Sequence, residues 1–534
     1  MQNWVRANSF FFLLFFALIV AYFPLLFSTE HFSPDASIIL PYLNSRTSLA
    51  GYWNDLINLK TIDFQPVRDL SLGLDLMILK KFGLKTFLWH NLILWFSTIL
   101  IVGRILKHIF PQITPTHIYV ALGLFALHPV FNTTLNWSMA RKHLLAFFFI
   151  CLATESFLRS KRFKTGMWYL LSVLSQPISL LWPVWALYYS WIYRKADLKK
   201  EWKLWIFLLA IITTAATVNT LYYQSSPTFQ GIYDSKTAFA FEFSDKILAL
   251  GHYVFTLTWP IPAFYYDLGH WSTLAGLIIM GLFLYLCLGL RLDRKFLGSW
   301  VLFGLLPLLI VLNTPRLLSD TYLLIPALGL LIIVIALLKK IAWTIPLLIP
   351  ALLAAGFIII NNIESRSWMD SLSFSQRNFE RRPNCLSALA LVRAQFSKEI
   401  VPTKEQKEFL KEYSCLTPQT KYQILEMMVI SANLVYYNPQ ESFQEKIETL
   451  TTYSKIHYYA DLILIALYIK EGSQVEAHEL ILKLAQRLHG KPIGTNSYDP
   501  IIAKVVLPYC QEKGFVTCEN VAHAFSQETN ELGL

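Results

Sequence analysis

The residues that could do chemistry lie in short polar segments next to apolar runs. The clearest segment is HPVFNTTLNWSMARKHLLAFFF (128–149), which places histidine, asparagine and three consecutive basic residues between two apolar runs. Polar groups without partners are costly in hydrocarbon, so this segment indicates the mouth of a polar site. Basic groups beside apolar spans suit a lipid-linked phosphate or pyrophosphate, and snorkelling to phospholipid headgroups is the alternative. The predicted phosphate-binding residues are Arg68, His128, Arg141, Lys142 and His143.

A carboxylate is the second chemical group that the sequence offers. Asp35 follows the first apolar run closely and precedes an amphipathic stretch. A carboxylate held at the membrane surface can have its basicity raised by desolvation, which suits a general base. A solvated loop residue or a helix N-cap is the alternative. The secondary candidates are Asp63, Asp69, His90, Asp320 and Tyr322.

The composition indicates a membrane protein. Of 534 residues, 55% are hydrophobic and 15% are charged, whereas about a quarter of the residues are charged in soluble domains. The net charge of +11 would suit nucleic acid if the basic residues formed one patch. They fall instead in short clusters between apolar runs, which is how membrane helices are oriented. We therefore expect no nucleic-acid partner.

The apolar runs predict an all-α bundle of about eleven transmembrane helices. They lie near residues 9–27, 86–103, 116–127, 144–158, 166–176, 179–193, 204–222, 272–290, 296–312, 322–338 and 341–361. With the N-terminus in the cytoplasm, every basic cluster between them falls on the cytoplasmic side. This orientation requires that the segment 247–263 lies at the interface or re-enters. The first run is long and lacks a small-residue cleavage site, which indicates an uncleaved helix.

The chain is predicted to form two domains. Residues 1–361 form the membrane domain, in which 28–85 is the first external loop, and residues 362–534 form an external helical domain. In the latter, Tyr468, Gly472 and Ala477 have the spacing of a tetratricopeptide repeat. A generic α-helical domain is the alternative, and either would bind a partner or an acceptor. A bacterial inner membrane with this domain in the periplasm fits, although an endoplasmic reticulum membrane would show the same asymmetry.

Cysteine usage is compatible with an external tail. A soluble domain outside the cytoplasm can form two disulfides from four cysteines, with three possible connectivities. Proximity in sequence favours pairing Cys385 with Cys415 and Cys510 with Cys518, and free thiols are the alternative.

The order of several segments resembles GT-C glycosyltransferases, specifically O-mannosyltransferase-like proteins with C-terminal tetratricopeptide repeats. HPVFNTTLNWSMARKHLLAFFF is similar to that family's His-Pro-Val, Ala-Trp-Ile and Gly-Arg stretch and the leucine-rich helix after it. FQPVRDLS with FLWHNLILW resembles its Tyr-Arg-Pro-Leu segment and its second span. LLSVLSQPISLLWPVWALYYSW resembles its Ser-Lys-Glu segment, and NTPRLLSDTYLLIPALGLL resembles its Glu-Arg-Tyr-Leu-Tyr-Leu-Pro segment. The resemblance covers roughly residues 10–340.

The resemblance implies a glycosyltransferase that moves a sugar from a polyprenyl phosphate to a protein, glycan or lipid acceptor on the non-cytoplasmic face. It implies that Asp35 is the base and that His128 and Arg141 contact the donor phosphate. A divalent metal is compatible with such an enzyme, although no residue pattern indicates one. The chain departs from the family's polar residues at Pro34, Gln65, Gln176, Pro177 and Thr321. These departures leave an inactive relative that acts as a membrane scaffold as the alternative, and the lack of paired interrupted half-helices disfavours a transporter.

Overall fold

The computed structural model describes residues 2–26, 49–57, 64–82, 86–194, 201–225, 243–258, 270–289, 294–308, 320–341, 348–381, 383, 385–398, 400–412, 433–437, 442–454, 459–488, 505–506 and 509. These residues are helical almost throughout and contain no strand, so the predicted all-α class is confirmed for the described part of the chain. The chain divides into two compact units, and the described residues pass from unit 1 to unit 2 between Asp370 and Ser371.

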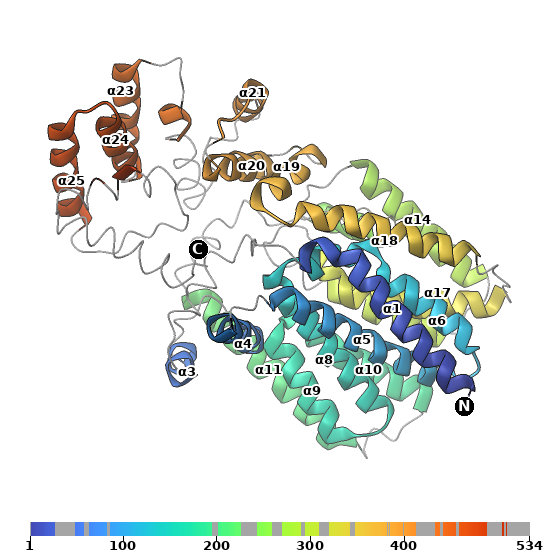
Figure 1. Cartoon of the computed structure of the whole chain (residues 1–534). Helices are drawn as coiled ribbons and strands as arrows, with labels where there is room; N and C mark the ends of the chain where they lie inside the picture. Colours follow the sequence, from blue (N-terminus) through green and yellow to red (C-terminus); the bar gives the residue numbers. More distant parts are fainter. Residues whose placement is uncertain are drawn as a thin grey trace. The chain divides into compact units, whose positions relative to one another are not determined.

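Unit 1 is a bundle of helices and short helical turns (Figure 1). Its first half contains α1 (Gln2–Leu26), α3 (Leu49–Ile57), α4 (Pro66–Phe82), α5 (Phe87–Ile109), α6 (Pro115–Leu127), α7 (Asn132–Asn136), α8 (Arg141–Leu158), α9 (Arg162–Ser175) and α10 (Trp182–Tyr189). Its second half contains α11 (Trp202–Ser225), α13 (Phe243–Thr258), α14 (His270–Gly289), α15 (Arg294–Trp300), η7 (Asp320–Leu323), α17 (Leu324–Ile341) and α18 (Leu348–Ser367).

Four described helices are long and apolar enough to cross a membrane. They are Phe87–Ile109, Trp202–Leu221, Asp320–Leu337 and Leu348–Ser367. The pair Pro115–Leu127 and Pro129–Asn136 makes a fifth if the two helices, bent by 41°, form one span. Three of the other predicted spans contain shorter apolar helical stretches, Ser9–Pro24, Leu274–Gly289 and Phe296–Leu308. Membrane association is therefore supported, and the larger number of spans stays a prediction.

Residues 128–140 of the polar segment form a set of short helical turns inside unit 1, and residues 141–149 begin the helix α8. α6 ends at Leu127, His128 is extended, and a 3-10 turn at Pro129–Phe131 leads into α7. The two asparagines of α7 are buried and face α18: Asn132 Nδ2 donates to Asn361 Oδ1 at 3.1 Å, and Asn136 Nδ2 donates to Ser365 Oγ at 3.3 Å. Asn361 in turn donates to the Leu127 carbonyl at 2.7 Å and accepts from Tyr22 of α1 at 3.3 Å. The polar side chains of this segment therefore form hydrogen bonds that connect α7 with α18, and α18 in turn bonds to α1 and to the end of α6.

Small residues allow the closest helix contacts. A Cβ atom added to Gly276 of α14 would lie 1.7 Å from the Gly251 carbonyl oxygen of α13. No real side chain is accommodated at that distance, so these two backbones touch directly. Residues 247–258 of the segment predicted to lie at the interface or to re-enter belong to the helix α13, which packs on α14.

Unit 2 consists of helical hairpins. Its described helices include α19 (Ser371–Arg381), α20 (Cys385–Ser397), α21 (Lys404–Glu412), α23 (Phe443–Ser454), α24 (Tyr459–Lys470) and α25 (Gln474–Leu488). Gly472 joins α24 to α25 with φ of 79°, which glycine adopts without strain. Ser473 N–H donates to the Tyr468 carbonyl at 2.9 Å across that turn, and Ala477 is buried at the helix contact. The spacing of these three residues therefore corresponds to a helical hairpin, and its assignment to a repeat stays a prediction.

Candidate functional site

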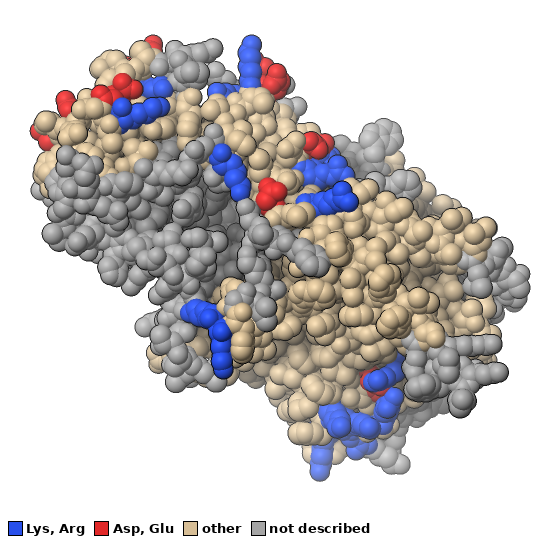
Figure 2. Space-filling view, viewed as in Figure 1, with Lys and Arg blue, Asp and Glu red and all other residues tan. Residues whose placement is uncertain are grey.

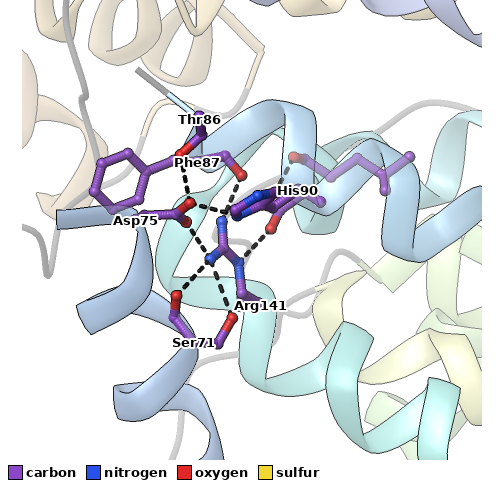
Figure 3. A network of polar contacts seen from close by, with 8 residues as sticks. Ser71, Asp75, Thr86, Phe87, His90 and Arg141 are labelled. Atoms are coloured by element: carbon purple, nitrogen blue, oxygen red, sulfur yellow. Dashed lines mark hydrogen bonds and ion pairs between the residues drawn. The ribbon is translucent and has the colours of Figure 1, made fainter. Parts of the chain in front are cut away.

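The candidate site centres on the carboxylate of Asp75, which the structure buries completely (Figure 3). Asp75 lies in the third turn of α4, on the face that packs against α8 and α9. Its Oδ1 accepts a hydrogen bond from Thr86 Oγ1 at 2.6 Å and contacts Nδ1 of His90. Its Oδ2 forms an ion pair with Nη1 of Arg141, the first residue of α8. Three helices therefore meet at one carboxylate.

Arg141 is held by acceptors of the protein on every nitrogen. Nε donates to Asn91 Oδ1 at 2.7 Å, Nη2 donates to the Phe87 carbonyl, and Nη1 also reaches the carbonyl and hydroxyl oxygens of Ser71 at 3.3 and 3.2 Å. The residue is 1% exposed. A phosphate could reach this guanidinium only by displacing these partners. Arg141, which was predicted to bind a phosphate, is the charge partner of Asp75 in the structure.

His90 differs from its neighbours because it reaches the surface of the cluster. Its side chain is 33% exposed, whereas the side chain of Asp75 is fully buried. A carboxylate that accepts from Nδ1–H fixes the tautomer, so that Nε2 of the neutral ring is an acceptor. Within the described part of the chain, the structure gives Nε2 no protein partner. The arrangement can therefore accept a proton at Nε2, and the imidazolium so formed can donate to an anion.

A second charged pair lies nearly two helical turns earlier on α4. Arg68 donates to Oδ1 of Asp69 at 2.6 Å from Nη2, and Tyr52 of α3 donates to Oδ2 of Asp69 at 2.9 Å. Nη1 of Arg68 donates to Gln65 at 2.9 Å, and Gln65 reaches Gln176 at 3.4 Å. Both charged residues are buried. This pair is balanced in charge and joins α3, α4 and the end of α9.

The structure gives the other described candidates no hydrogen bond or ion pair with Asp75. His128 accepts from the Val130 N–H at 3.2 Å and stands edge-on to Phe357 of α18, so it caps a turn. Lys142 is partly buried in the first turn of α8. The ring of His143 stands edge-on to the ring of Tyr322, with 5.1 Å between the ring centroids. Tyr322 belongs to η7, which begins at the buried Asp320.

Several predictions fall on parts that the structure does not describe. The predicted base Asp35, the secondary candidate Asp63 and three of the tail cysteines lie outside the described residues, as does the side chain of Cys385. The described free cysteines are Cys151 and Cys287, both buried. Among the described residues, no group of three histidine, cysteine or carboxylate side chains could hold a metal ion.

Sequence reasoning missed Asp75 itself, together with Ser71, Thr86 and Asn91. The signal was present in SLGLDLMILKKF, where one acid interrupts an apolar stretch. An ionisable residue in such a helix is costly and marks a function or a buried pair. Treating 28–85 as a loop concealed this signal, because acids are common in loops.

Comparisons of the chain with protein-family models, with curated proteins and with solved structures find no match.

Proposed function

We propose that this protein is a membrane glycosyltransferase that moves a sugar from a polyprenyl phosphate to an acceptor on the non-cytoplasmic face. The observation that supports this proposal is the buried Asp75 carboxylate that holds a partly exposed His90 beside a second charged residue, Arg141. Such a pair in the membrane domain can handle a proton or an anion at its surface. The sequence resemblance supplies the reaction class.

In the proposed reaction, His90 in its protonated form donates from Nε2 to the donor phosphate. Asp75 stabilises the imidazolium, and Arg141 holds Asp75 in place without touching the donor. The bond between the anomeric carbon and the phosphate oxygen breaks as the acceptor oxygen attacks from the opposite side, which inverts the configuration. The electron pair of the broken bond leaves on the phosphate, and the acceptor proton passes to a base. Asp35 is that base in the proposal.

The test is turnover of His90→Gln in purified protein with a panel of polyprenyl-phosphate sugars, scored by transfer and by donor hydrolysis. We expect a loss of about a hundredfold or more, the usual contribution of a positioned acid or base. His117→Gln is the matched control, because His117 is an exposed histidine of α6 that lies away from Asp75. Unchanged turnover in His90→Gln would exclude this role.

A catalytically inactive scaffold is the second candidate. It is favoured by Arg68 and Arg141, whose buried guanidinium groups are occupied by protein acceptors. A scaffold would work through unit 2, which would bind a protein partner. In cells that lack the native protein, a variant without residues 371–534 should then fail to restore function. The variant His90→Gln, expressed at the normal protein level, should restore function fully. The enzyme proposal requires that His90→Gln fail to restore it.

The proposed placement is an inner membrane of a bacterium, with about eleven spans, the N-terminus in the cytoplasm and unit 2 in the periplasm. Reporter fusions after Leu338 and after Ser365 test it. A cytoplasmic signal from the second fusion would contradict it.

A further inference from the structure

The turn between α8 and α9, together with the first turn of α9, presents six consecutive exposed residues, from Arg159 to Lys164; we call these six residues the α8–α9 turn. The turn is closed by backbone hydrogen bonds, from Ser160 N–H to the Phe157 carbonyl at 2.9 Å and from Lys161 N–H to the Ser156 carbonyl at 2.9 Å. Ser160 takes φ of 58°, an uncommon value for a residue other than glycine. The side chains that follow Ser160 are therefore carried on a compact, defined turn.

The charge at this turn is strongly positive. Lys161, Arg162 and Lys164 make no ion pair within the described part of the chain. Glu155 is shared by two arginines, at 2.8 Å from Arg159 and 3.9 Å from Arg104 of α5. Figure 2 shows Lys and Arg side chains gathered at this end of unit 1, with an acidic side chain among them. One carboxylate thus faces several cations.

The positive charge also stands at the unfavourable end of a helix. α9 begins at Arg162, has no acidic residue in its first turn and has no side-chain cap. Cations oppose the partial positive charge of a helix N-terminus. A bound anion would relieve both this repulsion and the repulsion among the cations.

An apolar group accompanies the charges. Phe163 is 80% exposed and lies between Arg162 and Lys164. The contact of Arg104 with Glu155 places the turn level with the last turns of α5, which is one of the candidate membrane spans. In a membrane crossed by α5, a turn at that level would lie near the lipid headgroups, and an exposed phenyl ring there would reach the acyl chains.

We propose that the α8–α9 turn binds the headgroup phosphate of an anionic phospholipid through Lys161, Arg162 and Lys164, with Phe163 against the acyl chain. The phosphate supplies the negative charge that the turn lacks, and the acyl chain covers the exposed ring. A free phosphate ion would satisfy only the charges. This site is independent of the proposed transfer reaction, because it lies at the opposite end of α8 from Arg141.

The chain offers a matched control at the end of α4. Lys80 and Lys81 precede Phe82, which is 61% exposed, so the same types of side chain occur there. They stand at a helix C-terminus, where cations are favourable, and lack the neighbouring arginines. The variants K161Q/K164Q and K80Q/K81Q therefore remove equal charge from a proposed site and from an ordinary basic helix end.

The experiment measures the Kd of a short-chain phosphatidylglycerol for the full-length protein in a zwitterionic detergent, by thermophoresis. Each cation near a lipid surface strengthens binding about fivefold, so K161Q/K164Q should weaken lipid binding about 30-fold. Added salt should reduce the difference in Kd between this variant and the unaltered protein. K80Q/K81Q should change the Kd less than about twofold, and F163A should weaken binding more than F82A does. The melting temperatures of all four variants show whether each is folded.

Three results would overturn the proposal. Equal weakening by the two lysine variants would mean general attraction of anionic lipid to a basic surface. Equal binding of the matching phosphatidylcholine would mean that the headgroup charge is not recognised. Competition by inorganic phosphate at the concentration at which the lipid binds would assign the site to a free anion.

Discussion

A double-mutant cycle on Asp75 and Arg141 tests the central claim that these residues are a buried charge pair. Asp75 is fully buried and Arg141 is 1% exposed, so water cannot replace a missing partner. Removing one member of such a pair costs about 3–5 kcal/mol, because the other charge is left buried without its counter-ion. We therefore expect Asp75→Leu and Arg141→Met each to lower the free energy of unfolding by about 4 kcal/mol.

The double variant should cost far less than the sum of the single variants. Replacing both charges by apolar groups of similar volume is often close to neutral, but Asn91, Ser71 and Thr86 would lose partners. We expect the double variant to lower the free energy of unfolding by about 3–4 kcal/mol. Subtracting this from the summed cost of the two single variants, about 8 kcal/mol, gives a coupling energy of about 4–5 kcal/mol.

The assay is reversible unfolding of the purified protein by a denaturing detergent, followed by tryptophan fluorescence. His90 serves as an internal reference, because Asp75 keeps its contacts with Arg141 and Thr86 when the partly exposed imidazole is removed. His90→Leu should therefore cost less than Asp75→Leu. Additive single and double substitutions, with coupling below about 0.5 kcal/mol, would refute a buried pair.

Three further predictions concern packing, the asparagine network and pH. Gly276→Ala should destabilise the protein by about 1–3 kcal/mol, because its Cβ would collide with the Gly251 carbonyl. Gly281→Ala in the same helix should not, because no atom lies within 4 Å of its Cβ. Equal melting temperatures of the two variants would contradict the contact between α13 and α14. Asn361→Ala should cost about 2 kcal/mol, because Leu127, Asn132 and Tyr22 lose a partner, and Asn362→Ala, which loses one exposed bond to Val20, should cost less; thermal unfolding decides between them. In unit 2, hydrogen bonds from the Ser442 hydroxyl and N–H hold the pKa of Glu445 below its usual range, so the stability from this cap is present above the ordinary pKa of about 4.3 and is lost as pH falls through the lowered value. An NMR titration should show the pKa of Glu445 rise in Ser442→Ala, and an unchanged pKa would contradict this cause.

Local sequence determined the helical class of this protein. Apolar runs, the spacing around Gly472 and the density of polar residues at 128–149 are all properties of neighbouring residues, and helices depend mostly on such neighbours. Capping follows the same rule: Ser442 with Glu445 begins α23 and Thr403 with Gln406 begins α21.

Tertiary structure decided which polar residues meet. Asp75 is 66 positions from Arg141 in sequence, and Asn132 is 229 positions from Asn361. A buried charge or amide must find a partner of opposite character wherever the bundle brings one close, and no periodicity encodes that partner. The sequence predicted that Arg141 contacts a donor phosphate, and in the fold its guanidinium pairs with Asp75. The reason is physical: the cost of burying a charge is local, while its compensation is set by how α4, α5 and α8 pack.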